Sequence, residues 1–498
     1  MRLGLEFALL AGAAVVLVSA MGVRVGMRYG VPSLLIFLAF GLVMGEAGLG
    51  LRFDNAALTR DLGLIALVVI LAEGGLTTDL DDIRPVLGLA AVLATIGVVI
   101  TVALVAVAAH AWLSMDWRTS VLLGGVVSST DAAVVFSVLR RLPLRARPRA
   151  ILEAESGIND APAIVIVSLA ASATWGVHPW WQSVGLGVYE LAAGAAAGWL
   201  IGMFGRWLLA RIALPAAGLY PLATLAFVVV AFAATSLAHA SGFLAVYICA
   251  LLLGSARLPH RRSVLGFSEG LAWLAQIGLF VLLGLLASPS RLPAAVLPAV
   301  IAGGVLTLVA RPAAVWACAI GFRVPWRERA FLSAAGLRGA VPIVLATVPL
   351  ADHVVGAGRV FDITFVLVVI FTAVQAPSLP WVARRLGMVS ADSAGELTVD
   401  SAPLDDMNAL LLDIAVPDRS RLSGEYVSDL RLPREALVSL VVRDGGFLVP
   451  DSTTRIRSGD RLLVVTTQAA RPDTERRLRA VSRAGILAAW FGETGARD

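Results

Sequence analysis

Thirteen apolar runs that could cross a bilayer as helices follow one another through the first 388 residues of the chain. They cover approximately residues 5–23, 32–50, 62–77, 85–110, 118–139, 157–175, 184–210, 219–240, 242–256, 267–287, 293–320, 328–350 and 360–382. A membrane helix needs about 20 apolar residues, so the short runs 62–77 and 242–256 leave a count of twelve open. Because only 15% of all residues are charged, against about 25% in soluble proteins, the sequence predicts a polytopic α-helical membrane protein.

The first run shares features with a secretory signal peptide, since Arg2 precedes an apolar core that ends in Val18-Ser19-Ala20. Only this one positive charge precedes the core, however, and many further apolar runs follow. We therefore interpret the run as a retained first helix.

Arginine is unevenly distributed between the two sets of loops that alternate along the thirteen runs. The set that begins after the first run holds eighteen arginines, and the set that includes the N-terminus holds six. Positive residues favour the cytosolic side, so we expect an external N-terminus, a cytosolic C-terminus and an odd number of helices. This distribution also assigns the net charge of +5 to topology and anionic lipid rather than to nucleic-acid binding.

The apolar pattern stops near residue 388, and a different kind of sequence follows. We expect four parts, namely a transmembrane domain (1–388), a small and polar linker (389–404), a soluble domain (405–468) and a helical tail (469–498).

The soluble domain carries the signals of a small α+β fold. Apolar runs at 411–416, 436–442 and 461–465 predict strands, and residues 423–430 predict a short helix. Basic residues interleaved with apolar ones at 471–491 predict an amphipathic end-helix, which we expect to pack on the domain rather than to bind the membrane.

Polar residues interrupt the fifth apolar run, where Ser128 and Ser129 precede Thr130 and Asp131. A carboxylate at this depth is unfavourable unless it is paired or faces a water-filled cavity. Hydroxyl side chains compete for backbone hydrogen bonds, so we expect the helix to break at Thr130-Asp131. The alternative is a purely structural Asp131 that an arginine neutralises.

A second polar cluster, Glu155, Ser156, Asn159 and Asp160, opens the sixth run. Glu155 and Asn159 lie four residues apart, as do Ser156 and Asp160, so each pair shares a helix face. Such oxygens suit a hard cation such as sodium or potassium, and a partly dehydrated carboxylate can also hold a proton near physiological pH. One carboxylate that binds either ion is the minimum device for exchange. The alternative is that Ser156 caps a helix start.

The twelfth run contains Arg338 between Gly336 and Gly339, with Pro342 close behind. Arginine stays charged in proteins, so Arg338 needs an acidic partner, and Glu155 is the natural candidate. Glycine and proline weaken a helix, so a second break is expected here. Each broken helix is the fourth of five runs, 2–6 and 9–13, which predicts inverted repeats with the site between them.

Two further charged residues are candidate accessories of the site. Glu73 stands beside Gly74 and could face the same cavity, and Arg311 could brace the core or pair with Glu73 or Asp131. The chain has no P-loop, no Cys/His spacing for a metal and no nucleophile elbow. We therefore expect a transporter, not an enzyme, and no cofactor.

Three segments resemble the core motifs of the monovalent cation:proton antiporter-1 family, the sodium/proton and potassium/proton exchangers of bacteria and archaea. They are Thr130-Asp131, Glu155-Ser156 with Asn159-Asp160, and Gly336-Leu337-Arg338-Gly339-Ala340. The resemblance covers about residues 1–388. It implies thirteen helices, a homodimer in the cell membrane and a mobile core with two crossed, unwound helices.

The resemblance also implies a role for each residue of the motifs. Asp160 would carry the monovalent cation and the proton in turn, next to Asn159. Thr130, Asp131 and Ser156 would support the cation, and Glu155 and Arg338 would form a structural ion pair. Gly157 and Ala161 depart from the bulkier residues that are common in the family.

Residues 405–468 resemble the C-terminal domain of regulators of potassium conductance. The resemblance rests on Ser423-Gly424, on the strand that starts at Ala436 and on the turn Ile456-Arg457-Ser458-Gly459-Asp460. Such domains dimerise and bind small ligands, often nucleotides, so we expect a regulatory ligand there, although no separate Rossmann half is present. Within the antiporter family this domain resembles the potassium/proton subgroup and favours potassium over sodium.

The sequence thus predicts electroneutral, one-for-one exchange of cytosolic potassium for external protons at Asp160, with sodium as the alternative cation. A ligand-gated cation channel, the remote alternative, would need a continuous pore with rings of carbonyls or charges, and no filter-like repeat occurs in the sequence. A sensor that has lost transport is disfavoured by the complete set of three motifs.

Overall fold

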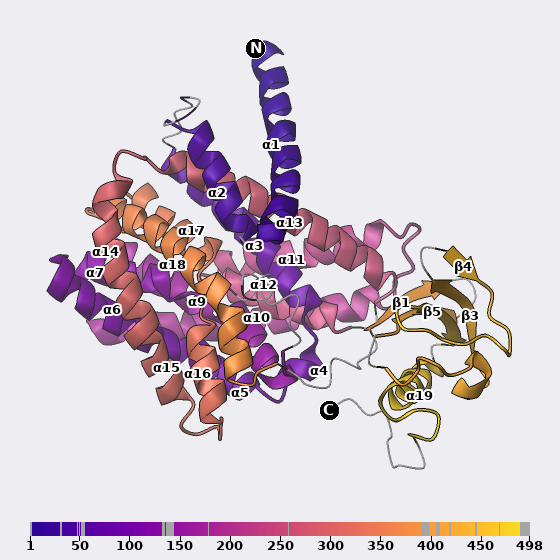
Figure 1. The fold of residues 1–498 in the computed structure, drawn as a ribbon. Helices are drawn as coiled ribbons and strands as arrows, with labels where there is room; N and C mark the ends of the chain where they lie inside the picture. The colour runs from indigo at the N-terminus through magenta and orange to yellow at the C-terminus, as the bar shows by residue number, and fades with distance from the viewer. Residues whose placement is uncertain are drawn as a thin grey trace. The chain divides into compact units, whose positions relative to one another are not determined.

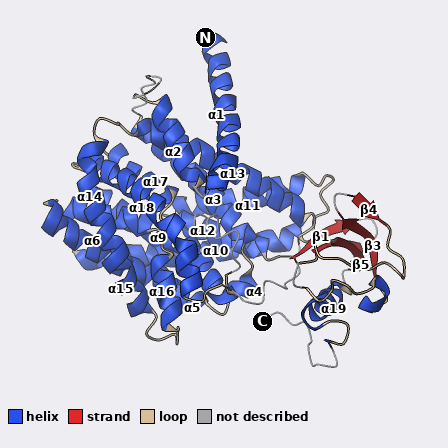
Figure 2. Cartoon of the chain, viewed as in Figure 1, coloured by secondary structure: helices blue, strands red, loops and turns tan. Residues whose placement is uncertain are grey.

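The computed structural model describes residues 2–29, 32–46, 48, 50, 55–131, 135, 144–177, 179–256, 258–389, 398–404, 409–417, 420–443, 446–467 and 469–488. The chain divides into two compact units, Met1–Val389 and Ser390–Asp498. The first unit is built from helices and the second around a β-sheet (Figures 1 and 2).

The helices of the first unit follow the predicted apolar runs. In chain order they are α1 (Arg2–Tyr29), α2 (Ser33–Met44), α3 (Ala56–Thr77), α4 (Leu80–Ile83), α5 (Leu87–Val92), η1 (Leu93–Gly97), α6 (Val98–Leu113), α7 (Trp117–Ser128), α9 (Ala146–Ala171), α10 (Trp180–Leu209), α11 (Leu219–Leu237), α12 (Gly242–Gly254), α13 (Arg261–Leu286), α14 (Leu292–Val305), η2 (Leu306–Ala310), α15 (Arg311–Cys318), α16 (Trp326–Ala334), α17 (Ala340–Ala351) and α18 (Ala357–Arg385). Six continuous helical stretches among the described residues are long and apolar enough to cross a membrane. Every predicted run contains helix, and the count of thirteen crossings stays a prediction.

The helices pack as two bundles. One contains α1, α2, α3 and α10 to α13, and the other contains α5 to α7, α9 and α14 to α18. The bundles meet where α17 packs on α3 and where α9 packs on α12. At the second contact Gly157 of α9 lies against the ring of Tyr247, so close that a Cβ atom there would fall 2.1 Å from a ring carbon. The departure at Gly157 noted in the sequence therefore makes room for an aromatic side chain of the other bundle.

A stripe of glycines on α10 explains why this long helix can approach α12 closely. A Cβ atom at Gly194 or Gly198 would lie 2.5–2.6 Å from backbone atoms of Ser241 or Ala245. The opposite face of α10 exposes large apolar side chains such as Trp199 and Phe204, as expected of a helix surface turned toward lipid.

Two long helices each contain one segment of π-helix. Segment η1 interrupts the helix at 87–113 and packs on α15, while η2 interrupts the helix at 292–318 and packs on α6. These helices are the third runs of the two predicted repeats, so the irregularities occur in corresponding members of the two halves. Inside α-helices π-helical turns are uncommon and are often found near functional sites.

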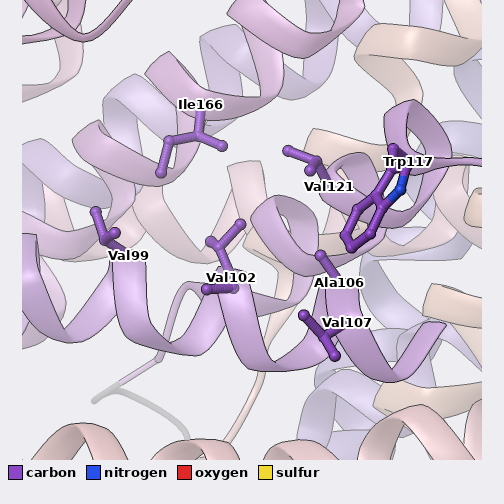
Figure 3. A pocket seen from close by; sticks show the side chains of 8 residues that line it. Val99, Val102, Ala106, Val107, Trp117, Val121 and Ile166 are labelled. Atoms are coloured by element: carbon purple, nitrogen blue, oxygen red, sulfur yellow. The ribbon is translucent and has the colours of Figure 1, made fainter. Parts of the chain in front are cut away.

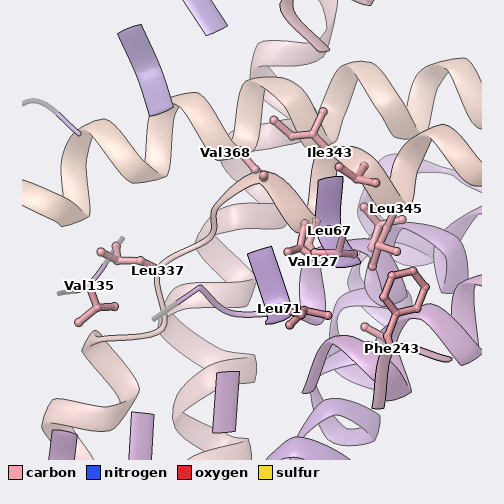
Figure 4. Close-up of a cluster of buried hydrophobic side chains, with 14 of the residues drawn as sticks. Leu67, Leu71, Val127, Val135, Phe243, Leu337, Ile343, Leu345 and Val368 are labelled. Atoms are coloured by element: carbon pink, nitrogen blue, oxygen red, sulfur yellow. The ribbon is translucent and has the colours of Figure 1, made fainter. Parts of the chain in front are cut away.

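Both predicted helix breaks are present, and the broken segments contact each other. Helix α7 ends at Ser128, and Ser129 continues with extended backbone (φ −63°, ψ 141°). Helix α16 ends at Ala334, and α17 begins only at Ala340. The backbone N–H of Asp131 donates to the carbonyl of Leu337 at 3.0 Å. Figure 4 shows Leu337 on a stretch without helix, among the buried side chains that surround the crossing.

Helices α7 and α9 are also joined at the ends that lie far from this crossing. Arg118, in the first turn of α7, donates to the carbonyls of Ala170 (2.8 Å), Ala171 (2.9 Å) and Ser172 (2.9 Å). The guanidinium therefore binds the carbonyls left free at the C-terminus of α9, which a helix cannot satisfy itself.

The second unit contains an antiparallel five-stranded sheet in the order β1-β2-β5-β3-β4. Its elements are β1 (Thr398–Leu404), β2 (Ala409–Ala415), the 3₁₀ turn η5 (Val427–Leu430), β3 (Ala436–Arg443), β4 (Gly446–Leu448), β5 (Arg461–Thr467) and α19 (Arg471–Ala484). The three predicted strands are confirmed, whereas the helix expected at 423–430 is reduced to η5. Part of the segment expected to be linker forms β1, which pairs with β2 along its whole length.

One face of the sheet is covered by apolar side chains from several elements. Leu412 and Leu462 from the strands are buried together with Leu478 and Val481 of α19. The end-helix thus packs on η5 and β5, as its amphipathic pattern predicted.

Candidate functional site

Helix α9 carries the polar cluster in its interior rather than at its start. The helix begins at Ala146, so the alternative in which Ser156 caps a helix is wrong. The preceding turns are helical because Ile151 and Ala154 are buried in the core, while Arg149 and Glu153 form an i,i+4 ion pair on the outside. The polar side chains therefore project from a continuous helix.

Three polar side chains of α9 contact the break after α7, and each of them has a different hydrogen-bond partner there. Ser156 Oγ donates to the carbonyl of Thr130 at 2.9 Å, and Asn159 Nδ2 donates to Thr130 Oγ1. Ser129 Oγ donates to Asp160 Oδ1. Asp160 is 3% exposed, and its carboxylate lies at the break after α7.

Asp131 lies on the other side of the same break. Its carboxylate touches Gly339, where a Cβ atom would fall 1.8 Å from Asp131 Oδ2. Gly339 is the N-cap of α17, and the N-terminus of a helix favours a negative charge. The second glycine of the motif at 336–340 is thus required because a carboxylate occupies the place of its side chain.

The structure corrects the expected partner of Glu155. Both carboxylate oxygens bind Arg311, with Nη2 2.9 Å from Oε2 and Nη1 in contact with Oε1. The two side chains are 1% and 6% exposed. Arg311 therefore pairs with neither Glu73 nor Asp131 in an ion pair, and it lies against Gly336, where a Cβ atom would come within 2.8 Å of Arg311 Nε.

Arg338 is buried beside this pair without taking part in it. Its Nε and Nη1 atoms have no hydrogen-bond partner, and no ion pair joins it to Glu155 among the described residues. Its backbone carbonyl accepts a hydrogen bond from Thr372 of α18 at 3.0 Å. The predicted pair of Glu155 with Arg338 is wrong because two arginines lie near the cluster, one on α15 and one between α16 and α17. Spacing along the chain does not say which of them reaches Glu155.

The structure brings together Thr130, Ser156, Asn159 and Asp160, and adds Ser129, which the sequence reasoning did not assign to the site. The sequence feature that could have indicated Ser129 is the run of hydroxyl residues at the break. Glu73 is half-buried on α3, and among the described residues no hydrogen bond or ion pair links its carboxylate to the cluster. Its accessory role stays a prediction.

A separate pocket of about 300 Å³ lies between α6, α7 and α9. It is lined by apolar side chains alone, among them Val102, Trp117 and Ile166 (Figure 3). A cation needs oxygen ligands, so this pocket is no alternative to the polar cluster.

Comparisons with known proteins show which family the chain resembles in sequence. The model of the sodium/hydrogen exchanger, transmembrane family matches residues 13–385, and the model of the TrkA-C domain matches residues 411–479. The K(+)/H(+) antiporter NhaP of Alkalimonas amylolytica is 35% identical over 96% of this chain and 84% of its own length. The K(+)/H(+) antiporter NhaP2 of Shewanella sp. strain MR-4 is 34% identical over 92% of this chain and 80% of its own length.

A solved structure shows the same fold. The sodium proton antiporter MjNhaP1 from Methanocaldococcus jannaschii at pH 8 superposes with a TM-score of 0.65 at 20% identity, over 77% of this chain and 99% of that chain. The chain therefore belongs to the sodium/hydrogen exchanger family. It is a multi-pass cation/proton antiporter, not an enzyme, and it carries a C-terminal TrkA-C domain.

Proposed function

We propose that the chain exchanges potassium for protons, one for one, and that Asp160 binds the two ions in turn. The observation that carries the proposal is the position of this buried carboxylate at the break after α7, where Ser129 donates a hydrogen bond to it and where Thr130 binds the neighbouring Ser156 and Asn159. A carboxylate held away from bulk water has two ways to lose its charge, which are a proton and a monovalent cation.

The ligands available to the cation are oxygens, as a hard ion requires. Asp160 offers its carboxylate, and Ser156 and Thr130 offer hydroxyl or carbonyl oxygens from facing segments. Asn159 Oδ1 is buried and has no hydrogen-bond partner in the part of the chain that the structure describes, so it is a further oxygen that a bound cation can satisfy. Asp131 supports the site from across the break as a second negative charge.

The formal charges of the cluster favour a stoichiometry of one. Among the described residues of the cluster, the charges of Glu155 and Arg311 cancel, those of Asp131 and Arg338 sum to zero, and Asp160 leaves the empty cluster with one negative charge. One proton or one monovalent cation makes the cluster neutral, and a net charge within the membrane is unfavourable. The loaded cluster therefore has the same charge with either ion, which supports electroneutral exchange.

The choice of potassium rests on the relatives. The two relatives that are 34% and 35% identical are named for potassium, and the similarity extends over the C-terminal domain as well, whereas the solved structure that is 20% identical is named for sodium. Sodium is the alternative cation, and the two are separated by titrating each salt independently.

We also propose that the protein is a homodimer in the cell membrane, with its N-terminus outside and its C-terminus in the cytosol. In this arrangement the TrkA-C domain regulates exchange by binding a small, nucleotide-type ligand. The excess of arginine in the loops assigned to the cytosolic side and the match of residues 411–479 support the proposal.

The decisive experiment measures cation-driven proton flux in everted vesicles, with potassium and sodium titrated separately. We expect Asp160→Asn to abolish exchange while the protein still inserts and folds. Asp352→Asn, an exposed residue at the C-terminal end of α17, is the matched control and should exchange normally. Robust exchange by the Asp160→Asn variant, or a cation conductance that is independent of pH, would exclude the proposal.

A further inference from the structure

Among the described residues, it is Ser129 whose side chain donates a hydrogen bond to the Asp160 carboxylate. The serine is completely buried and lies directly after the last residue of α7. Its neighbour Ser128 differs, since Ser128 Oγ donates to the carbonyl of Gly125 in its own helix at 2.7 Å. Two adjacent serines therefore have separate tasks, one within the helix and one at the ion site.

The break in the helix makes this contact possible. Residues in the last turn of α7 point their hydroxyls back along the helix, whereas Ser129 has left the helical conformation (ψ 141°). Thr130 supplies its carbonyl and hydroxyl to Ser156 and Asn159. Residues 129 and 130 thus provide a distinct partner for each polar side chain on this face of α9.

We propose that Ser129 is a positioning residue whose hydroxyl changes its hydrogen-bond role with the ion bound at Asp160. A hydroxyl has one donor and two acceptor lone pairs. When the site is empty, it donates to the charged carboxylate, as observed. When a cation is bound, the lone pairs of the Ser129 hydroxyl face the cation. When Asp160 is protonated, the Ser129 oxygen accepts a hydrogen bond from the carboxyl O–H. The inference rests on the proposed role of Asp160 as the carrier.

The loss of this hydroxyl has a defined direction. The empty, charged carboxylate and the cation-bound state lose a partner, while the protonated state can turn its O–H elsewhere. Protons should therefore compete with the cation up to a higher pH. Among the residues that the structure describes, the other charged groups near Asp160 are Asp131 across the break, the Glu155–Arg311 pair on α9 and α15, and Arg338 before α17. All of them are unchanged in the variants below, so a shift reports on Ser129.

The test compares Ser129→Ala, Ser129→Thr and Ser128→Ala in the full-length chain, with proton flux measured in everted vesicles over a grid of potassium concentration and pH. Removing a hydrogen bond to a charged carboxylate favours its protonated form about tenfold or more, so the proton competes more strongly with potassium for Asp160. We expect Ser129→Ala to raise the half-saturating potassium concentration about tenfold and to shift the pH profile about one unit toward alkaline pH. Ser129→Thr keeps the hydroxyl and should restore both values toward wild type, and Ser128→Ala should leave both unchanged.

The inference is overturned if Ser129→Ala has the half-saturating potassium concentration and pH profile of the wild type, or if it lowers only the maximal rate. It is also overturned if Ser128→Ala shifts both values equally. If Ser129→Ala is not recovered as folded protein, Ser129→Cys, which has a similar volume and a weak donor, is judged by the same two values. Exchange by Asp160→Asn would contradict the proposed function, whereas an inactive Asp160→Asn with an unshifted Ser129→Ala would contradict the Ser129 role alone.

Discussion

Both units of the chain bury a carboxylate against an arginine, and the two ion pairs are built differently. In the membrane unit Glu155 and Arg311 are almost completely buried and come from helices 156 positions apart. In the C-terminal unit Asp460 binds Nε and Nη2 of Arg443 at 2.8 and 2.7 Å. There the carboxylate is 1% exposed, but the arginine side chain is 21% exposed.

The difference lies in what each carboxylate does besides forming the pair. Asp460 also accepts the backbone N–H of Arg457 at 2.7 Å, so it closes its own turn and needs Arg443 only in part. Glu155 has both oxygens on Arg311, and no water in the bilayer core can replace the arginine. A buried pair in the membrane therefore fixes two distant helices, whereas the pair in the C-terminal unit fixes a loop.

The largest effect is expected when the membrane pair is broken on one side. Arg311→Gln leaves Glu155 buried and unpaired, which costs about 3–5 kcal/mol, and the detergent-purified protein should lose much of its thermal stability. Arg338→Gln should cost less, because two nitrogens of Arg338 have no hydrogen-bond partner among the described residues. The double variant Glu155→Gln with Arg311→Gln should recover part of the loss. If Arg338→Gln proves more destabilising than Arg311→Gln, the assignment of the pair is incorrect.

The corresponding change in the C-terminal unit should have a smaller effect that is confined to that unit. Asp460→Asn weakens two charge-assisted hydrogen bonds but keeps a side chain that can still accept one, so we expect a cost of about 2 kcal/mol. Limited proteolysis of the full chain should show faster cleavage within residues 409–488, with the helical unit unaffected. Faster cleavage in the membrane unit would show that the two units do not respond separately.

The Asp460–Arg443 pair should also make the stability of the C-terminal unit depend on pH. Burial alone would raise the pKa of Asp460, but the hydrogen bonds from Arg443 and the Arg457 backbone, with the charge of Arg443, hold it below its usual value. A carboxyl whose pKa is lower in the folded state stabilises the fold above its unfolded pKa of about 3.9. That contribution is lost as the pH falls through the folded pKa. The Asp460→Asn variant should therefore lose less stability than the wild type between neutral and acidic pH, as proteolysis at each pH would measure.

Two glycines extend the comparison from charge to space. Gly339 has no room for a methyl group because of Asp131, whereas Gly459 has open space but a positive φ of 83°. We expect Gly339→Ala to impose a strain of about 1–3 kcal/mol on the ion site and to reduce exchange strongly. Gly459→Ala should cost about 1 kcal/mol through its backbone alone and leave exchange intact. Equal exchange in both variants would contradict the close contact between Gly339 and Asp131.

The smallest effect is expected at an exposed ion pair. Asp413 and Arg461 lie on neighbouring strands, with side chains 26% and 59% exposed. Exposed pairs contribute between zero and about 1 kcal/mol, so Asp413→Asn should change the proteolysis rate little. A loss as large as that of Asp460→Asn would show that burial does not explain the difference between the two pairs.

Local chemistry made most of the fold predictable. Apolar runs located the helices, and the hydroxyl residues at 128–130 and the glycines at 336 and 339 located both breaks, because these residues weaken a helix wherever it lies. The turn at Ser458-Gly459 likewise indicated where strand β5 begins. Asp160 stood out because a carboxylate in an apolar run demands a reason.

Three-dimensional contacts were predictable only where one partner was available. Glu155 had two buried arginines within reach of the site, and the choice of Arg311 depends on how α9, α15 and α17 are rotated, which no spacing encodes. Ser129 and Ser128 are chemically identical, and only the residue at which α7 ends gives them different partners. Strand β1 was missed because a segment of small polar residues pairs through its backbone, which leaves little trace in composition.

The hydrogen bonds of Arg118 to the end of α9 restrict how α7 and α9 can move relative to each other at the proposed ion site. Helix α7 is joined to α9 there, and again at Ser129 and Thr130 about 16 Å further along the helix axis, at a rise of about 1.5 Å per residue. Two helices that are hydrogen-bonded to each other near both ends of α7 cannot slide along each other as they could with a single contact. The distances among Asp160, Ser156 and Thr130 are therefore set by contacts at both ends of α7, and a change at Arg118 should reach them even though Arg118 itself is remote.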